Sequence, residues 1–358
     1  MYYLYPDYYK KFHCIADKCI DTCCAEWQIV IDDESLEKYR NYKGDYRQTL
    51  CQNIDWEEGV FGHNKRGKCA FLRDDDLCDM YIHMGEDSLC TTCREYPRHT
   101  EEFENLREIT LSLSCPEVAK IVMNTTEPIT FVTKEDETDE CYEEFDYFLF
   151  SELEDVREEM IRIIQDRNVN LRDRIDKILQ ISVSVQRHYD AGSLISWNEF
   201  EESDRVCVEN EYELFERLFL FLFEEFEILY PQWAEVLVES RLFLFGEGKK
   251  VFEQNKEEFE TWWNTSNLTP LDIVLEQLVV YFISVYLLGA VYDENILGKV
   301  DACIGHTIEI YLLLLGRWLK HGELAMDDVI EVVYRYSREI EHSDENLERA
   351  EMLNWFAR

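Results

Sequence analysis

Apolar residues recur with a helical period throughout the chain beyond residue 141. They are spaced three and four residues apart, which places them along one face of a helix. Segments with this spacing are 142–166, 171–189, 208–230, 233–245, 249–263, 270–292, 295–320, 325–341 and 344–357. The pattern therefore predicts that residues 141–358 form an all-helical domain.

The first 123 residues show little regular period and are predicted to be mainly loops. Apolar and polar side chains alternate over residues 27–31, which indicates a short strand. Asp33 or Ser35 then opens a helix with an acidic first turn. Pro116 opens a second helix that runs through Met123. Aromatic side chains are concentrated among the first twelve residues, and we expect them to cover the core of this region.

A polar, charged stretch separates the two regions. Residues 124–140 read NTTEPITFVTKEDETDE and are interpreted as a linker. The expected organisation is therefore a cysteine-rich, metal-binding domain at 1–123, a linker at 124–140 and a helical domain at 141–358. The fold class is mainly α: a loop-rich N-terminal region with little strand, followed by an all-helical C-terminal region.

Composition and charge bear on whether the protein binds nucleic acid or a membrane. The 358 residues carry a formal net charge of −40, and no basic face for nucleic acid is visible. The longest apolar run, 278–292, is shorter than the roughly 18–20 residues of a membrane span. The first residues, MYYLYPDYYKKF, lack the features of a signal peptide. We therefore expect a cytoplasmic protein that binds neither nucleic acid nor membrane; its oligomeric state does not follow from the sequence.

A few polar residues interrupt the most apolar helices. Glu276 and Gln277 lie in one such helix, and His306 and Glu309 in another. Buried polar groups need partners, so these four residues are candidates for lining a cleft. The favoured interpretation is that they face water.

Cysteine is the residue that suggests chemistry. Of the 13 cysteines, nine lie in two blocks of the first third of the chain. These nine are the predicted metal ligands: Cys14, Cys19, Cys23, Cys24, Cys69, Cys78, Cys90, Cys93 and Cys115. Cysteines used only for packing would be scattered, so their convergence indicates that something holds the sulfurs together.

Disulfides, zinc and an iron–sulfur cluster compete for that role. Disulfides belong to oxidising compartments and are disfavoured here. Zinc takes four thiolate or imidazole ligands, often as short-spaced pairs such as Cys90 and Cys93. Iron–sulfur clusters also take four thiolates with irregular spacing. Nine thiols allow one centre with spare cysteines or two centres, and spacing alone does not distinguish zinc from iron–sulfur.

Two arginines flank the second cysteine block. Arg94 and Arg98 lie in LCTTCREYPR. A guanidinium group can pair with a local carboxylate, or it can clamp an anionic group of a ligand with two parallel hydrogen bonds. Both interpretations stay open from the residues alone.

Four cysteine blocks in order carry a resemblance to a known family. They are YKKFHCIADKCIDTCCAEWQIVID, CAFL followed by LC, LCTTCREYPR and SLSCPE, and together they cover residues 9–118. This arrangement resembles the flagellin lysine-N-methylase family, and also a wider cysteine-rich group of zinc- or iron-chelating domains. The helical part resembles the methylase family only in length and character.

The resemblance implies an activity. It implies transfer of a methyl group from S-adenosylmethionine to the ε-amine of lysines on flagellin, with an iron–sulfur cluster of the four-iron, four-sulfur type; zinc is the alternative metal. The C-x-x-x-C-x-x-C spacing typical of radical enzymes that use this cofactor is absent, which favours a structural role for the centre.

Methyl transfer to lysine requires a neutral amine, so a group must remove its proton. The candidates are Tyr96, Glu95 and Glu117, with Arg94 and Arg98 as cofactor-binding residues. The competing hypothesis is a non-catalytic zinc- or iron-binding protein with a helical interaction domain.

Overall fold

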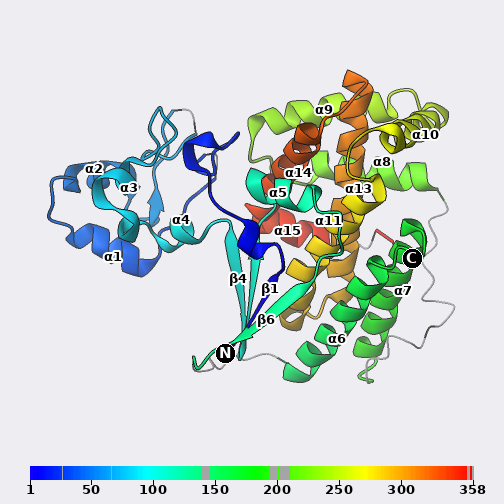
Figure 1. Cartoon of the computed structure of the whole chain (residues 1–358), viewed down its shortest axis with the longest axis horizontal. Helices are drawn as coiled ribbons and strands as arrows, with labels where there is room; N and C mark the ends of the chain where they lie inside the picture. The colour runs from blue at the N-terminus through cyan, green and yellow to red at the C-terminus, as the bar shows by residue number, and fades with distance from the viewer. Residues whose placement is uncertain are drawn as a thin grey trace.

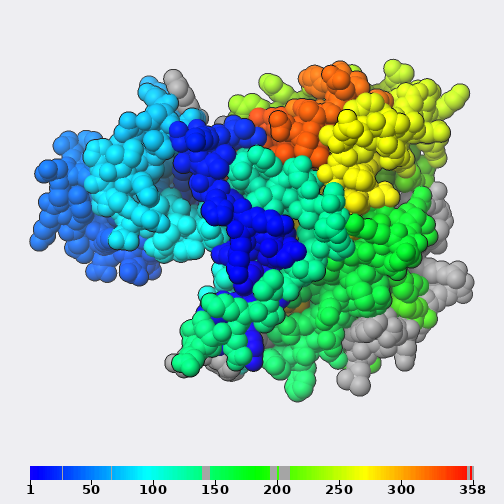
Figure 2. Space-filling model, in the orientation of Figure 1, coloured from blue at the N-terminus to red at the C-terminus, as the bar shows by residue number. Residues whose placement is uncertain are grey.

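The chain forms a helical body with a smaller lobe attached to one side. The structure is a computed structural model, and it describes residues 1–25, 27–65, 67–138, 146–193, 200, 210–352 and 355–356. In Figure 1 the lobe carries the labels α1 to α4, and the body contains α5 and the later helices. The space-filling view in Figure 2 shows the N-terminal segment lying between the lobe and the body.

The body confirms the helices that the apolar period predicts. They are α5 (Pro116–Met123), α6 (Tyr147–Ile164), α7 (Leu171–Asp190), α8 (Glu211–Glu224), α9 (Pro231–Phe245), α10 (Lys249–Thr265), α11 (Leu271–Tyr286), α12 (Ala290–Asp293), α13 (Ile296–His321), α14 (Met326–Glu341) and α15 (Asp344–Glu351). The helix from Pro116 to Met123 has the predicted bounds. Two helices are shorter than predicted: the one expected over 208–230 spans Glu211–Glu224, and the one expected over 344–357 spans Asp344–Glu351. Residues 208–209, 353–354 and 357 lie outside the described part.

A four-stranded sheet joins the body and was not predicted. Its strands are β1 (Tyr2–Pro6), β4 (Arg98–Phe103), β5 (Leu106–Leu111) and β6 (Phe131–Glu135), in the order β4-β5-β1-β6. Strand β1 runs parallel to β5 and antiparallel to β6. The predicted linker therefore contains a strand, whose Phe131, Val132 and Thr133 suit a pleated backbone. Residues 139–140 lie outside the described part, and the domain boundaries stay a prediction.

A buried ion pair ties this sheet to the helices. Arg157 on α6 donates to both carboxylate oxygens of Glu108 on β5, at 2.7 and 2.5 Å. Both side chains are less than one-tenth exposed. The core of the body is also continuous with the sheet, because Phe103 and Leu111 pack in the same buried cluster as the helices.

The lobe has a small core of its own. It contains α1 (Asp33–Asn41), α2 (Arg47–Asn53), α3 (Asp79–Met84) and α4 (Thr91–Glu95), with a short hairpin of β2 (Ile54–Asp55) and β3 (Val60–Phe61). Helix α1 begins where predicted, with Asp32 as its cap. The strand predicted over 27–31 is wrong: in the part of this segment that the structure describes, Val30 forms a single bridge to Val60. Ile29 and Ile31 are nevertheless buried in the lobe core.

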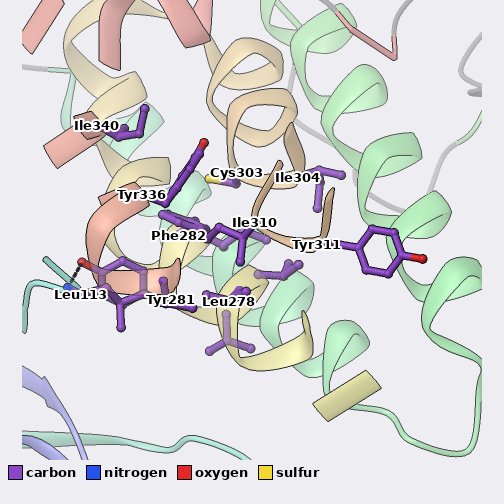
Figure 3. Packing of buried hydrophobic residues seen from close by; sticks show 14 of the residues in the cluster. Leu113, Leu278, Tyr281, Phe282, Cys303, Ile304, Ile310, Tyr311, Tyr336 and Ile340 are labelled. Atoms are coloured by element: carbon purple, nitrogen blue, oxygen red, sulfur yellow. Dashed lines mark hydrogen bonds between the residues drawn. The ribbon is translucent and has the colours of Figure 1, made fainter. Parts of the chain in front are cut away.

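Helices α11 and α13 form the centre of the body. Figure 3 shows their side chains, including Leu278, Phe282 and Ile310, packed together with Tyr336 of α14. Among the described helices, 271–293 and 296–321 are long and apolar enough to cross a membrane by length and composition alone. Their most apolar windows are 67% and 78% buried inside the protein, as in core helices of a folded domain.

The polar residues of these two helices are buried and paired, so the expectation that they face water is wrong. Glu276 binds Arg167 and Arg174, at 2.8 and 2.7 Å. Gln277 donates to two backbone carbonyls that precede β6. In α13, His306 and Glu309 both contact the hydroxyl of Tyr336. These contacts give each of the four side chains a partner within the body.

Candidate functional site at the junction of lobe and body

The nine predicted ligand cysteines are all free thiols. Cys69 and Cys90 are buried in the lobe core, and Cys24, Cys78 and Cys93 pack against it. Cys115 is instead buried in the core of the body. No disulfide joins these nine residues, which leaves every sulfur available to a metal.

Burial controls the protonation of these thiols. It raises the pKa of Cys69 to about 11 and that of Cys115 to about 12. Backbone N–H groups that donate to the two sulfurs oppose the rise. Without a metal, both thiols therefore stay protonated near neutral pH, and a bound cation would displace those protons.

The chemistry of the donors fits a thiolate-bound metal. Four thiolates complete a zinc site or an iron–sulfur cluster, and the first third of the chain supplies nine. Within the described residues, no group of three or more His, Cys, Asp or Glu side chains is already arranged around a common point for an ion. The cysteines thus fit by chemical type, and binding would require their side chains to turn toward one another.

A chain of hydroxyl groups begins at Tyr96, where the lobe meets the body. The Tyr96 hydroxyl lies 3.0 Å from Ser114 Oγ. Ser114 Oγ contacts Ser112 Oγ, which in turn donates to the carboxylate of Glu341 at the end of α14. Tyr281 of α11 donates to the other oxygen of Glu341 at 2.8 Å and accepts from the backbone N–H of Leu113 (Figure 3). The chain links the lobe to the sheet and two helices.

The pKa values of Tyr96 and Glu341, which lie at the two ends of the hydroxyl chain, are shifted. Burial, together with the nearby Cys115 and Cys23 thiols, raises the pKa of Tyr96 well above its usual value. Tyr96 is therefore a neutral phenol. Burial also raises the pKa of Glu341, although its hydrogen bonds from Ser112 and Tyr281 oppose the rise. A carboxylate with a raised pKa is better matched to accept a proton near neutral pH.

His342 completes the junction. Its ring stacks on Trp27, with centroids 4.6 Å apart, and its Nε2 lies 3.2 Å from Ser114 Oγ. Burial and the positive charge of Arg338 lower its pKa to about 3. Arg338 itself donates to the Ser114 carbonyl and pairs with Asp21 at 2.9 Å. The neutral imidazole thus supports the hydroxyl chain without adding a charge.

The other predicted site residues lie apart from this chain of hydroxyls. Arg94 and Glu95 form an exposed ion pair with each other, at 3.1 Å. The guanidinium of Arg98 lies over the rings of Tyr9 and Phe12 and donates to the Tyr9 hydroxyl. These contacts commit both arginines to local partners.

Glu117 lies on the first turn of α5, two residues after Cys115. Its carboxylate is 3.8 Å from Lys120, and its backbone N–H donates to the Cys115 sulfur. The structure therefore brings Tyr96 and Cys115 to the junction, whereas the carboxylates of Glu95 and Glu117 pair with Arg94 and Lys120.

Sequence reasoning missed Ser112, Ser114, Glu341 and His342. The serines flank Leu113 within the SLSCPE block, so the motif itself could have indicated them. Glu341 lies 229 residues from Ser112 in the chain. The available signal for a functional role of Glu341 is its place among charged residues at the end of the otherwise buried helix α14. That signal does not identify a partner.

A separate cavity of about 310 Å³ lies within the helical body. Its walls are mainly apolar and include Ile175, Phe215 and Leu275. The polar pair formed by Tyr311 and Glu260, 3.0 Å apart, also faces it. The cavity shares no lining residue with the hydroxyl chain at the junction, so a ligand there would be bound by the body alone.

Comparison with known proteins identifies a family for the helical part of the chain. Residues 157–356 match the family model described as the FliB lysine N-methylase C-terminal domain. No solved structure matches the chain.

Two curated relatives match over the same length. A lysine-N-methylase of Salmonella typhimurium is 30% identical over 128 residues, which cover 33% of this chain and 32% of that protein. The flagellar biosynthetic protein FliU of Salmonella muenchen is also 30% identical over 128 residues, which cover 75% of its length. The match thus spans about a third of the first relative. The family model covers more than half of the present chain, and the chain belongs to the FliB lysine N-methylase family.

Proposed function

We propose that the protein transfers a methyl group from S-adenosylmethionine to lysine side chains of flagellin. Membership of the lysine N-methylase family is the observation that carries this proposal. The name of the Salmonella muenchen relative, a flagellar biosynthetic protein, supports a flagellar substrate. The proposed location is the cytoplasm, where flagellin is available before export.

The negative net charge of the chain supports a protein substrate that presents lysine side chains. The chain has a formal net charge of −40, and a field of this sign attracts positively charged surfaces and speeds their encounter. The attraction is screened by salt, so substrate capture should weaken as ionic strength rises.

The proposed reaction needs a proton acceptor beside the substrate amine. A lysine amine is charged near neutral pH, and only its neutral form has the electron pair that attacks the methyl group. Of the three candidates, Tyr96 has the best support, because its hydroxyl leads through Ser114 and Ser112 to Glu341. The phenol would orient the amine, and the proton would pass along the hydroxyl groups to the Glu341 carboxylate.

The proposed metal would be held by the cysteines of the lobe and junction. We propose an iron–sulfur cluster of the four-iron, four-sulfur type, with zinc as the alternative. When bound, such a centre neutralises thiolate charge and fixes the loops that carry it. The proposed role of the metal centre is structural: it would hold Tyr96 in place against α14.

Donor turnover tests the proposed activity. Protein purified without oxygen is mixed with S-adenosylmethionine, and the demethylated donor is quantified by chromatography with and without flagellin. We expect product to accumulate only when flagellin is present. No flagellin-dependent turnover by protein that retains its metal would overturn the proposal.

Two variants, Ile175→Trp and Tyr96→Phe, distinguish an active site at the junction from one in the cavity of the body. Ile175→Trp narrows the cavity without touching the hydroxyl chain, so turnover should persist in this variant. Loss of donor binding in Ile175→Trp, together with normal turnover in Tyr96→Phe, would move the active site to the cavity.

The competing function is a metal-binding module without catalysis. The nine free thiols are the observation in its favour. Isothermal titration with S-adenosylmethionine separates the two functions, because a pure metal module should release no heat. Heat of binding with flagellin-dependent turnover would exclude it.

A further inference from the structure

We propose that the free edge of strand β4 binds an extended, lysine-bearing segment of the protein substrate as an additional strand of the sheet. An exposed sheet edge can pair with an extended peptide through backbone hydrogen bonds. The inference rests on the proposed methylation of protein lysines, and it names the form in which the substrate presents them.

Strand β4 lies at one end of the four-stranded sheet. The order is β4-β5-β1-β6, so β5 pairs with one side of β4 only. Among the residues that the structure describes, no strand pairs with the other side. His99, Thr100 and Glu102 of this strand are exposed. A peptide can therefore approach the backbone of β4 from the side opposite β5.

Two hydrogen bonds show which backbone groups of β4 face that side. The carbonyl of Pro97 accepts from the N–H of Ser112, directly after β5, at 2.8 Å. The carbonyl of Glu102 instead accepts from the hydroxyl of Tyr292 on α12, at 3.4 Å. In an antiparallel pair, residues that bond to the partner strand alternate with residues whose backbone groups point away. The residues that point away from β5, here called the docking edge, are therefore Arg98, Thr100 and Glu102.

The docking edge begins beside the proposed proton acceptor. Arg98 is the first residue of β4 and follows Tyr96 by two positions. The hydroxyl of Tyr96 starts the hydrogen-bonded chain that leads to Glu341. Figure 1 shows β4 running from α4 of the lobe into the sheet. A segment bound along β4 would thus bring its lysine side chains to the junction.

The charges along β4 suit a cationic partner. Glu101 and Glu102 lie on the strand, and Glu104 lies in the turn that follows. Glu101 pairs with His99 and Glu102 with Arg107, yet the two carboxylates stay 42% and 57% exposed. Opposite charges on neighbouring strands attract one another, so lysines on an added strand would be favoured here.

The opposite end of the sheet provides a matched control. Strand β6 carries Lys134, and a lysine on an edge strand discourages pairing with a further strand. The carbonyl of Thr130 accepts from the N–H of Asp7, at 2.8 Å, which fixes the alternation in β6. Thr133 therefore points away from β1, and like Thr100 it is exposed.

Fluorescence anisotropy tests the docking edge with a synthetic peptide. The probe is a fluorescein-labelled peptide of alternating lysine and threonine, about ten residues long so that it can span β4. It is titrated with full-length protein in the absence of a methyl donor. We expect saturable binding, and weaker binding of a peptide in which glutamine replaces every lysine.

Thr100→Pro removes one outward N–H and leaves the bonds to β5 in place. Proline is tolerated on an edge strand where its missing N–H would face solvent. We expect the variant to bind the lysine peptide roughly tenfold more weakly, which corresponds to the loss of about one hydrogen bond. Thr133→Pro makes the same change at the other end of the sheet and should bind as wild type does. Circular dichroism confirms that both variants fold.

Hydrogen exchange of the wild-type protein gives a readout that needs no variant. The outward N–H groups of β4 face solvent, and an added strand would accept hydrogen bonds from them. We therefore expect the lysine peptide to slow exchange over residues 98–103 and to leave exchange over residues 131–135 unchanged.

Unchanged exchange over residues 98–103, or equal affinity of the wild-type protein and Thr100→Pro for the lysine peptide, would overturn the inference. Equal binding of the glutamine peptide would overturn the preference for lysine. If Thr100→Pro does not fold, the exchange measurement decides. Because no methyl donor is present, a failure of the proposed activity is recognised separately: the peptide would bind along β4 without being methylated in a later assay.

Discussion

At the scale of single residues, the Tyr96 hydroxyl is the group on which the proposed chemistry depends. Tyr96 takes part in the hydrogen-bonded chain that ends at Glu341 through its hydroxyl group. Its ring has a different role, because it packs against Trp27 and His342. Removing the oxygen therefore separates the proposed chemistry from the packing of the junction.

We expect Tyr96→Phe to retain the fold and to lose roughly 10²–10⁴-fold in the rate of methyl transfer, the usual cost of removing a general acid–base group. Initial rates with saturating donor and flagellin give the measurement, and circular dichroism confirms folding. Tyr81→Phe is the control, since Tyr81 is 47% exposed on the lobe and should behave as wild type. Equal rates for Tyr96→Phe and wild type would contradict a role for this hydroxyl.

Asp301 provides a pH-dependent test of the body. Burial raises its pKa from 3.8 to about 7. The folded protein therefore holds a proton that the unfolded chain releases above about pH 4, and stability falls as pH rises from about 4 to about 7.

Asp301→Asn removes this loss, because an amide carries no proton to release. The free energy of unfolding of the variant, relative to wild type, should increase with pH by up to about 1.4 kcal/mol per unit across that window and then level off. Urea denaturation at several pH values measures it. Asp327→Asn, at an exposed position, should show no such trend; a flat difference for Asp301→Asn would show that Asp301 titrates normally.

At the scale of elements, the helical period of apolar residues predicted the helices, whose formation depends on residues close together in the chain. The helices from α6 to α14 each bury a face, and the residues of that face recur three and four positions apart within one short segment. The sheet escaped prediction because β1 pairs in parallel with β5, so that Tyr2 lies opposite Leu106. No window of neighbouring residues contains that pairing.

The link between the sheet and α6 can be tested at Arg157. Arg157→Met leaves the Glu108 carboxylate buried without its partner, and loss of one member of a buried pair costs about 3–5 kcal/mol. Urea denaturation measures the loss.

Arg162→Met on the same helix is the matched control. Arg162 is 65% exposed and pairs with Glu159 on the surface, so its loss should leave stability almost unchanged. Equal stabilities for the two variants would show that the Arg157–Glu108 pair contributes no more than a surface contact.

At the scale of the whole molecule, the lobe and the body differ in what stabilises them. The body has a large apolar core, whereas the lobe has a small cluster with five cysteines in or against it. Small domains of this kind commonly depend on a metal for folding. The concentration of cysteines in the sequence predicted a metal site in this part of the chain, and that stays a prediction. The junction with α14 required the fold, because Ser112 and Glu341 lie 229 residues apart in the chain.

Metal removal should therefore affect the two parts unequally. After chelation under reducing conditions, we expect a protease to cleave within the lobe while the body stays resistant, and cleavage sites are mapped by mass spectrometry. Restoring the metal should restore protection of the lobe. Simultaneous cleavage of lobe and body would contradict a metal that stabilises the lobe more than the body.

Labelling of flagellin tests the proposed activity most directly. Flagellin is incubated with the anaerobically purified protein and S-adenosylmethionine bearing a deuterated methyl group, and its peptides are then sequenced by mass spectrometry. The account predicts the isotopic label on lysine side chains with wild-type protein and strongly reduced labelling with Tyr96→Phe. Flagellin without label after incubation with metal-loaded wild-type protein would contradict it.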